Sequence, residues 1–161
     1  MGNILTRSEA IDSRSQLKTA GKTLVFTNGH FDLLHVGHLD YLEKARALGD
    51  ALYVGVNGDA VSRMQKGPGR PIVPAVERAR LLAALCCVDA AIIFEEPTAI
   101  ELITALHPEI YVKGGDYHER PLPERETVER AGGRVVLIDF LPDHSTSGLI
   151  AQIRALPEPR P

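Results

Sequence analysis

The chain alternates short apolar runs, rich in β-branched residues, with segments of helical periodicity, and this alternation restricts its possible folds more than any other feature. We predict strands at residues 22–28, 51–57, 90–94, 109–113 and 134–139. Helices are expected at residues 37–48, 75–85, 98–106, 124–131 and 145–156. Strands separated by helices form right-handed βαβ units, so the sequence predicts an α/β, Rossmann-like fold with a five-stranded parallel sheet and helices on both faces.

Length and composition are those of a globular protein. We expect residues 1–161 to form a single domain, with its core over about residues 22–153. The net charge of −3 does not suit a protein that binds nucleic acid, and no apolar run approaches the ~20 residues that span a bilayer. Residues 1–20 are polar and lack the apolar centre of a secretion signal. We therefore expect a cytoplasmic protein without nucleic-acid or membrane partners.

The two cysteines, Cys86 and Cys87, are neighbours near the end of a predicted helix. A bridge between adjacent residues is strained, and no other cysteine is available. Neither cysteine has the spaced partners of a zinc site. We expect both to be buried free thiols.

Polar residues follow four of the predicted strands, at residues 28–38, 57–59, 113–116 and 143–147. In a parallel sheet of this kind, ligands bind beyond the carboxyl ends of the strands, where the strand order reverses. These four clusters are therefore expected to meet at one edge of the sheet and to form a binding site there.

His35 and His38 are separated by nearly one helical turn, around Gly37, at the start of a predicted helix. A helix N-terminus offers free N–H groups and a partial positive charge, and the glycine would let a ligand approach the backbone. The pattern predicts a triphosphate site. Two histidines on one helical face could instead bind zinc, but no further ligand has the usual spacing, so no metal bound by the protein is expected. Two ordinary histidines, at the surface or at the edge of the core, are the remaining alternative.

The residues before these histidines frame the same predicted site. The Thr27 hydroxyl can donate to a phosphate, and Gly29 permits a tight turn or a close backbone approach. Asp32 either supports the structure through hydrogen bonds or contacts a ligand directly. Asn28 and Phe31 complete the nucleotide-binding residues predicted in this stretch.

Lys113 follows a strand and can reach a phosphate as a flexible point charge, with Gly114 leaving room for the ligand. Asp116 is assigned to the same binding surface. Lys66 lies in a Gly/Pro-rich stretch, interpreted as a mobile loop, from which Lys66 and Arg70 could close over phosphates.

Arg78, one turn into the next predicted helix, is a further nucleotide-binding candidate. The last helix opens on three hydroxyl residues that can cap it, hold phosphate oxygens, or do both: Ser145, Thr146 and Ser147.

A phosphate site without an obvious serine nucleophile or carboxylate base favours a reaction that needs neither. A phosphomonoester is already a nucleophile at neutral pH, because its second pKa is about 6. It could attack the α-phosphate of a nucleoside triphosphate in line and expel pyrophosphate. The protein would then position the reactants and neutralise charge. Mg²⁺ would be bound mainly through the triphosphate.

Four stretches, TNGHFDLLHVGH, VNGDAVSRMQKGPGRP, VDAAIIFEE and VKGGDY, resemble the cytidylyltransferase-like nucleotidyltransferases. Within this family, the chain is most similar to the adenylyltransferases of ADP-heptose synthesis, over about residues 22–153. The resemblance implies AMP transfer from ATP to D-glycero-β-D-manno-heptose 1-phosphate, giving ADP-heptose and pyrophosphate. That domain is often fused to a sugar kinase and here stands alone, so a separate kinase is expected upstream. A homodimer is also expected.

The resemblance assigns phosphate-binding catalytic roles to His35 and His38, with Lys113 assisting. It assigns nucleotide contacts to residues already singled out above: Thr27, Asn28, Lys66, Ser145, Thr146 and Ser147.

The sequence departs from related patterns at two places. His30 stands where the heptose branch commonly has cysteine, which could alter the selectivity of the pocket. The Arg-x-x-Gly-Ile-Ser-Thr pattern of related cytidylyltransferases is absent near residues 141–146, which favours the heptose branch. A cytidylyltransferase acting on glycerol 3-phosphate or another alcohol phosphate is the alternative enzyme. A nucleotide-sensing module without catalysis is the alternative of a different class.

Overall fold

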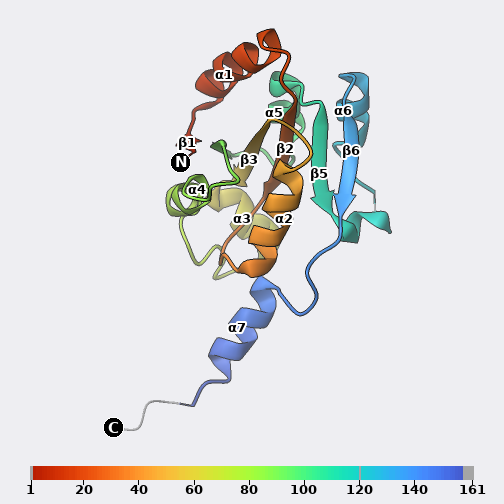
Figure 1. The fold of residues 1–161 in the computed structure, drawn as a ribbon. Helices are drawn as coiled ribbons and strands as arrows, with labels where there is room; N and C mark the ends of the chain where they lie inside the picture. Colours follow the sequence, from red (N-terminus) through yellow and green to blue (C-terminus); the bar gives the residue numbers. More distant parts are fainter. Residues whose placement is uncertain (1, 120, 158–161) are drawn as a thin grey trace.

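A six-stranded parallel sheet forms the centre of the computed structural model, which describes residues 2–119 and 121–157 (Figure 1). The strands are β1 (Asn3–Ile4), β2 (Leu24–Gly29), β3 (Ala51–Asn57), β4 (Ala90–Phe94), β5 (Ile110–Gly114) and β6 (Arg134–Ile138). The predicted parallel α/β fold is confirmed, with six strands instead of five. The additional strand, β1, is a two-residue edge strand paired with β4, too short and too exposed to leave an apolar run in the sequence.

Seven α-helices and one 3₁₀ helix connect or follow the strands in the described part of the chain. They are α1 (Arg7–Thr19), α2 (Val36–Arg46), α3 (Asp59–Lys66), α4 (Ala75–Ala83), α5 (Ile100–Leu106), η1 (Gly115–His118), α6 (Arg125–Arg130) and α7 (Thr146–Arg154). Helices α1 and α3 were not predicted. The start of α1 is marked by a capping box between Thr6 and Glu9, a sequence signal that would have identified it.

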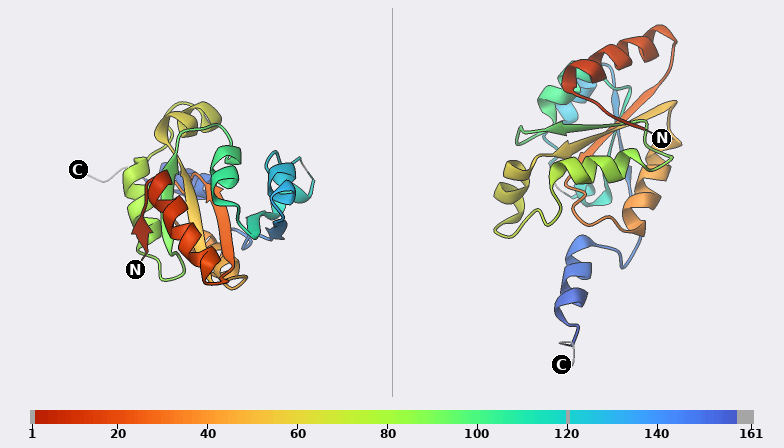
Figure 2. Two further views of the ribbon diagram at one scale, coloured as in Figure 1. Left: turned by 90° about the horizontal axis from the view of Figure 1, so that it is seen from above. Right: turned by 90° about the vertical axis from the view of Figure 1, so that its left-hand side faces the viewer.

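Helices cover both faces of the sheet, as predicted (Figure 2). Neighbouring residues of a strand point to opposite faces. Val25 accordingly packs in one apolar cluster with α2 and α4, whereas Phe26 packs in the other with α1, α5 and α6. Both strand faces are buried, which explains why β2 and β3 appear in the sequence as continuous apolar runs rather than alternating ones.

The strand order β1-β4-β3-β2-β5-β6 reverses between β2 and β5. From β2 the chain moves through β3 and β4 toward one edge, and β5 then pairs on the other side of β2. The carboxyl ends of β2 and β5 therefore lie side by side at the point where α/β sheets bind ligands. Asn28 and Lys113 are at these two ends.

Helix α7 extends away from the sheet, and none of its residues is buried (Figures 1 and 2). Its first turn contacts the segment before α2 through Thr146 Oγ1, which donates to the Leu33 carbonyl at 3.5 Å. No helix in the described part of the chain is long and apolar enough to cross a membrane. Of the cysteines, Cys87 is buried but Cys86 is exposed in the turn after α4, so the prediction of two buried thiols was wrong for Cys86.

Candidate functional site

A cavity of about 380 Å³ lies beyond the carboxyl ends of β2 and β5. Most of the predicted site residues line it: Asn28, Gly29, Phe31, Asp32, His35, Gly37, His38, Lys66, Lys113, Gly114, Ser145, Thr146 and Ser147. Three of the four predicted polar clusters therefore meet at one place. The fourth, residues 57–59, does not line the cavity, because Asn57 and Asp59 contact Arg78 instead. The cavity combines histidines, two lysines, an arginine and the N-termini of α2 and α7, a set suited to phosphate groups.

The two motif histidines stack on one another at the start of α2. Their ring centroids are 3.9 Å apart, and Phe31 meets His38 edge-on at 5.4 Å. The Nδ1 atoms of both rings are buried without a hydrogen-bond partner, so contacts within the described protein do not fix their tautomers. No side chain caps α2, which leaves its first N–H groups available to a ligand.

Gly37 is required for this stacking. A Cβ atom at position 37 would lie 3.1 Å from the His35 ring and 2.9 Å from the Cβ atom of His144. A side chain at this position would displace the His35 imidazole from its place over the helix. The glycine of the motif thus makes room for a histidine, in addition to the ligand access predicted from the sequence.

Burial lowers the pKa of several histidines in the cavity. The pKa of His38 is lowered to about 4 by burial and by the adjacent His35. The pKa of His30 is lowered to about 4 by burial and by the nearby charges of Lys66, Arg78 and Lys113. Both rings are therefore neutral at neutral pH in the free protein.

These shifts predict that the protein loses stability in mild acid. An unfolded imidazole has a pKa of about 6.5, so between about pH 6.5 and 4 the unfolded chain binds more protons than the folded one, and stability falls as pH is lowered through that window. Thermal unfolding of the wild type and of His38→Ala across this range should show a shallower pH dependence for the variant. A folded-state His38 pKa near that of a free imidazole, measured by NMR, would contradict this.

Lys113 joins the two strands at which the sheet order reverses. Its side chain is buried, and Nζ donates to the Asn28 carbonyl and to Asn28 Oδ1, both at 3.3 Å. The same ammonium group lies 5.1 Å from the centroid of the Tyr117 ring. These contacts hold a positive charge at the floor of the cavity.

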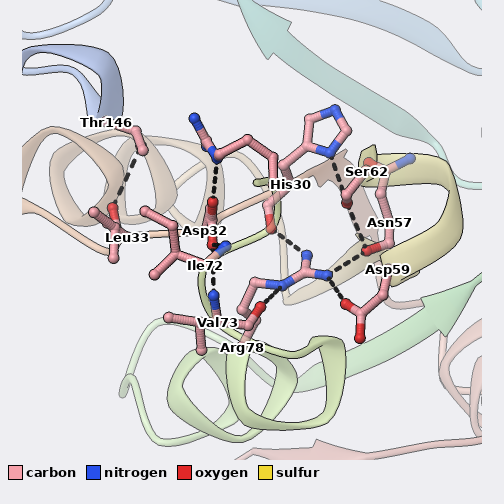
Figure 3. A network of polar contacts seen from close by, with 11 residues as sticks. His30, Asp32, Leu33, Asn57, Asp59, Ser62, Ile72, Val73, Arg78 and Thr146 are labelled. Atoms are coloured by element: carbon pink, nitrogen blue, oxygen red, sulfur yellow. Dashed lines mark hydrogen bonds and ion pairs between the residues drawn. The ribbon is translucent and has the colours of Figure 1, made fainter. Parts of the chain in front are cut away.

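Asp32 acts as an anchor for the loop between α3 and α4 (Figure 3). Its Oδ1 atom accepts hydrogen bonds from the backbone N–H groups of Ile72 and Val73, and its Oδ2 atom pairs with Arg70 Nε at 2.5 Å. Burial would raise the pKa of this carboxyl, but the hydrogen bonds from Val73, Ile72 and Arg70 outweigh it and lower the pKa. Of the two roles open from the sequence, the contacts favour structural support.

Arg78 does not line the cavity, so its prediction as a direct nucleotide contact is corrected. Its side chain is fully buried, and the guanidinium donates to the carbonyl oxygens of His30, Asn57 and Val73 (Figure 3). It also pairs with Asp59 at 2.8 Å. Arg78 thus connects the loops that follow β2 and β3 with the loop before α4.

The remaining predicted residues include one that lies in the core and one whose side chain is not described. Thr27 is buried and its hydroxyl lies 2.7 Å from that of Tyr41, so it is corrected from a phosphate contact to a core hydrogen bond. The backbone of Asp116 lies in η1, and its side chain is outside the described residues. Ser145 caps α7, accepting from the Gly148 N–H group at 3.0 Å.

The cavity also includes Tyr41, Tyr117, Phe140 and Leu141, which the sequence did not assign to it. Phe140 and Leu141 follow β6, and their place after a strand was the available signal. Arg70 lines it as well, as expected of a residue that could close over phosphates, and so do His30 and His144 from two of the predicted polar clusters. Among the described residues, no three His, Cys, Asp or Glu side chains are grouped as ligands for a metal ion.

The sequence of this chain is similar to those of known proteins. The sequence profile of the cytidylyltransferase-like family matches residues 26–149. The chain is 54% identical over 133 residues to the bifunctional protein HldE of Syntrophotalea carbinolica, covering 83% of this chain and 27% of that protein. It is also 54% identical over 137 residues to HldE of Geotalea uraniireducens, covering 85% and 28%. The chain thus spans little more than a quarter of the length of these relatives.

Two solved structures share the fold. A lipopolysaccharide core biosynthesis protein from Thermoplasma volcanium superposes with a TM-score of 0.62 at 28% identity, covering 75% of this chain and 98% of that one. A pantoate-beta-alanine ligase from Francisella tularensis, solved with an ATP analogue, has the same TM-score at 14% identity, over 98% and 74% of the two chains.

The fold, the histidine motif at a helix N-terminus and these matches define an enzyme of the nucleotidyltransferase class. The chain belongs to the cytidylyltransferase-like family.

Proposed function

We propose that this chain transfers AMP from ATP to a sugar 1-phosphate, giving an ADP-sugar and pyrophosphate. D-glycero-β-D-manno-heptose 1-phosphate is the proposed acceptor, because the motif resemblance and the HldE relatives point to the heptose branch. The observation that carries the proposal is the shared cavity of His35, His38 and Lys113 at the reversal of strand order. Residues 1–161 are proposed to act as one nucleotidyltransferase domain.

In the proposed reaction, an oxygen of the acceptor phosphate attacks the α-phosphorus of ATP in line. A new P–O–P linkage forms as the bond to pyrophosphate breaks, and the electron pair leaves with the pyrophosphate oxygen. The phosphate nucleophile needs no general base near neutral pH. His35, His38 and Lys113 would bind the phosphate chain and stabilise the charge that develops on the transferred and leaving groups. The α2 and α7 N-termini would add N–H donors.

Mg²⁺ is proposed to enter as part of the ATP complex. Asp32, the carboxylate that lines the cavity among the described residues, is occupied by Arg70 and two backbone N–H groups. Phosphate oxygens are common ligands of Mg²⁺, and the ion would neutralise charge on the β- and γ-phosphates.

The partners beyond the substrates are also proposals. We propose that a sugar kinase supplies the heptose 1-phosphate and that the chain acts as a homodimer. Light scattering after size-exclusion chromatography measures the oligomeric state.

Pyrophosphate release tests the reaction directly. We expect release with ATP and heptose 1-phosphate, and not when CTP, GTP or UTP replaces ATP or when glycerol 3-phosphate replaces the sugar. Mass spectrometry should identify ADP-heptose. Release with CTP and glycerol 3-phosphate would instead indicate the cytidylyltransferase alternative, whereas nucleotide binding without turnover would indicate a sensor.

A further inference from the structure

Arg70 carries a charge into the cavity that the proposed mechanism does not use. It lies in the loop between α3 and α4, and its side chain is 18% exposed and lines the same cavity as His38 and Lys113. Its Nε atom pairs with Asp32. Among the described residues, nothing forms a hydrogen bond or ion pair with its two terminal nitrogens.

The anchor that holds Arg70 is itself rigidly placed. The side chain of Asp32 is 1% exposed and accepts from Ile72 and Val73 as well as from Arg70. Val73 is held a second time, because its carbonyl accepts from Arg78. The loop is therefore fixed by two buried charged residues from two directions. These contacts hold the Arg70 side chain at the cavity without a ligand. The mobility expected from the glycines and prolines of the loop stays a prediction.

The two terminal nitrogens of the Arg70 guanidinium are suited to binding a phosphate group. The group stays charged at all ordinary pH values, and its planar fork can donate two parallel hydrogen bonds to phosphate oxygens. With Nε bonded to Asp32, the two terminal nitrogens are left for such a contact. Lysine could not hold the anchor and present a fork at the same time.

We propose that Arg70 binds a phosphate group of the substrates, either in the nucleotide or in the sugar 1-phosphate, and that Asp32 is its positioning residue. The proposal rests on the proposed function, because it takes the cavity as a phosphate-transfer site.

Titration calorimetry with ATP, inorganic pyrophosphate, AMP and heptose 1-phosphate separates the sources of that phosphate. We expect Arg70→Ala to weaken binding of at least one of them by about 10-fold or more, the scale of a lost charge-assisted hydrogen bond. Loss for ATP and pyrophosphate with AMP unchanged assigns Arg70 to the β- and γ-phosphates. Loss for ATP and AMP assigns it to the α-phosphate, and loss for heptose 1-phosphate alone assigns it to the acceptor.

Arg70→Lys should recover only part of the affinity. Arg63→Ala, an exposed arginine of α3 outside the cavity, is the matched control and should bind as the wild type does.

A double-mutant cycle tests whether Asp32 acts through Arg70. Asp32→Asn should weaken the same ligand, and adding it to Arg70→Ala should cause no further loss; circular dichroism and thermal unfolding monitor the fold of each variant. The proposal is overturned if Arg70→Ala binds all four ligands as Arg63→Ala does, or if Asp32→Asn weakens binding equally in both backgrounds. A wild type that works with CTP would remove only the proposed ATP specificity, and the cycle would be run with CTP. A wild type that binds none of these phosphates would overturn both proposals.

Discussion

Replacing His38 with alanine is expected to lower kcat by at least about 100-fold, the scale of a lost preorganised charge-stabilising donor. The ring lies in the cavity at the start of α2, stacked on His35. The proposed reaction concentrates negative charge on phosphate oxygens at this place, and the ring would stabilise that charge more in the transition state than in the bound substrate. The loss should therefore appear mainly in kcat and less in KM.

The same substitution should leave the fold intact. The Nδ1 atom of His38 has no hydrogen-bond partner among the described residues, so its removal leaves no buried donor or acceptor unpaired. What is lost is packing against Phe31 and His35. Alanine also suits a helical position.

Steady-state pyrophosphate release, with circular dichroism as a check on folding, measures both expectations. His118→Ala is the matched control, because His118 is exposed and does not line the cavity. Turnover by a folded His38→Ala variant close to that of the His118→Ala variant would rule out the proposed role.

The sequence predicted the central strands because they are buried on both faces. A strand such as β3 must then be apolar throughout, which distinguishes it from the helices around it. Strand β1 and helix α1 lack this signal. Only Ala10 and Arg14 are buried in α1, and β1 is held mainly by backbone pairing with β4, which does not depend on side-chain type.

The place of the site was predictable, but the direction of its charged side chains was not. Carboxyl ends of parallel strands meet whatever residues follow them, so the residues after β2 and β5 were correctly expected to lie together. Arg70 and Arg78 are both basic residues near one loop, and no local pattern separates them. Arg78 is buried because carbonyl groups of three loops converge on it, and these come from tertiary structure alone.

Replacing Arg78 with methionine is expected to destabilise the protein by about 3–5 kcal/mol, because three carbonyl oxygens lose their donor and each buried group left unsatisfied costs about 1–3 kcal/mol. The guanidinium donates hydrogen bonds to the carbonyl groups of His30, Asn57 and Val73 and to the Asp59 carboxylate. Methionine fills a similar volume but donates no hydrogen bond. For a protein of this size, the expected fall in Tm is about 6–20 °C.

Two further variants test whether the effect comes from the hydrogen bonds of Arg78, from its positive charge alone, or from any change in helix α4. Arg78→Lys keeps the positive charge, but one ammonium group cannot reach acceptors on several sides, so most of the destabilisation should remain. Arg80→Ala changes an exposed arginine of the same helix, α4, and should leave Tm nearly unchanged. A Tm for Arg78→Met equal to that of Arg80→Ala would contradict a stabilising role for the Arg78 hydrogen bonds.

Because the same contacts hold the loops that carry His30 and Val73, the destabilised variant should also bind ATP more weakly at temperatures where it remains folded. A stable Arg78→Met variant with normal ATP affinity would show instead that these loops are held by their apolar packing.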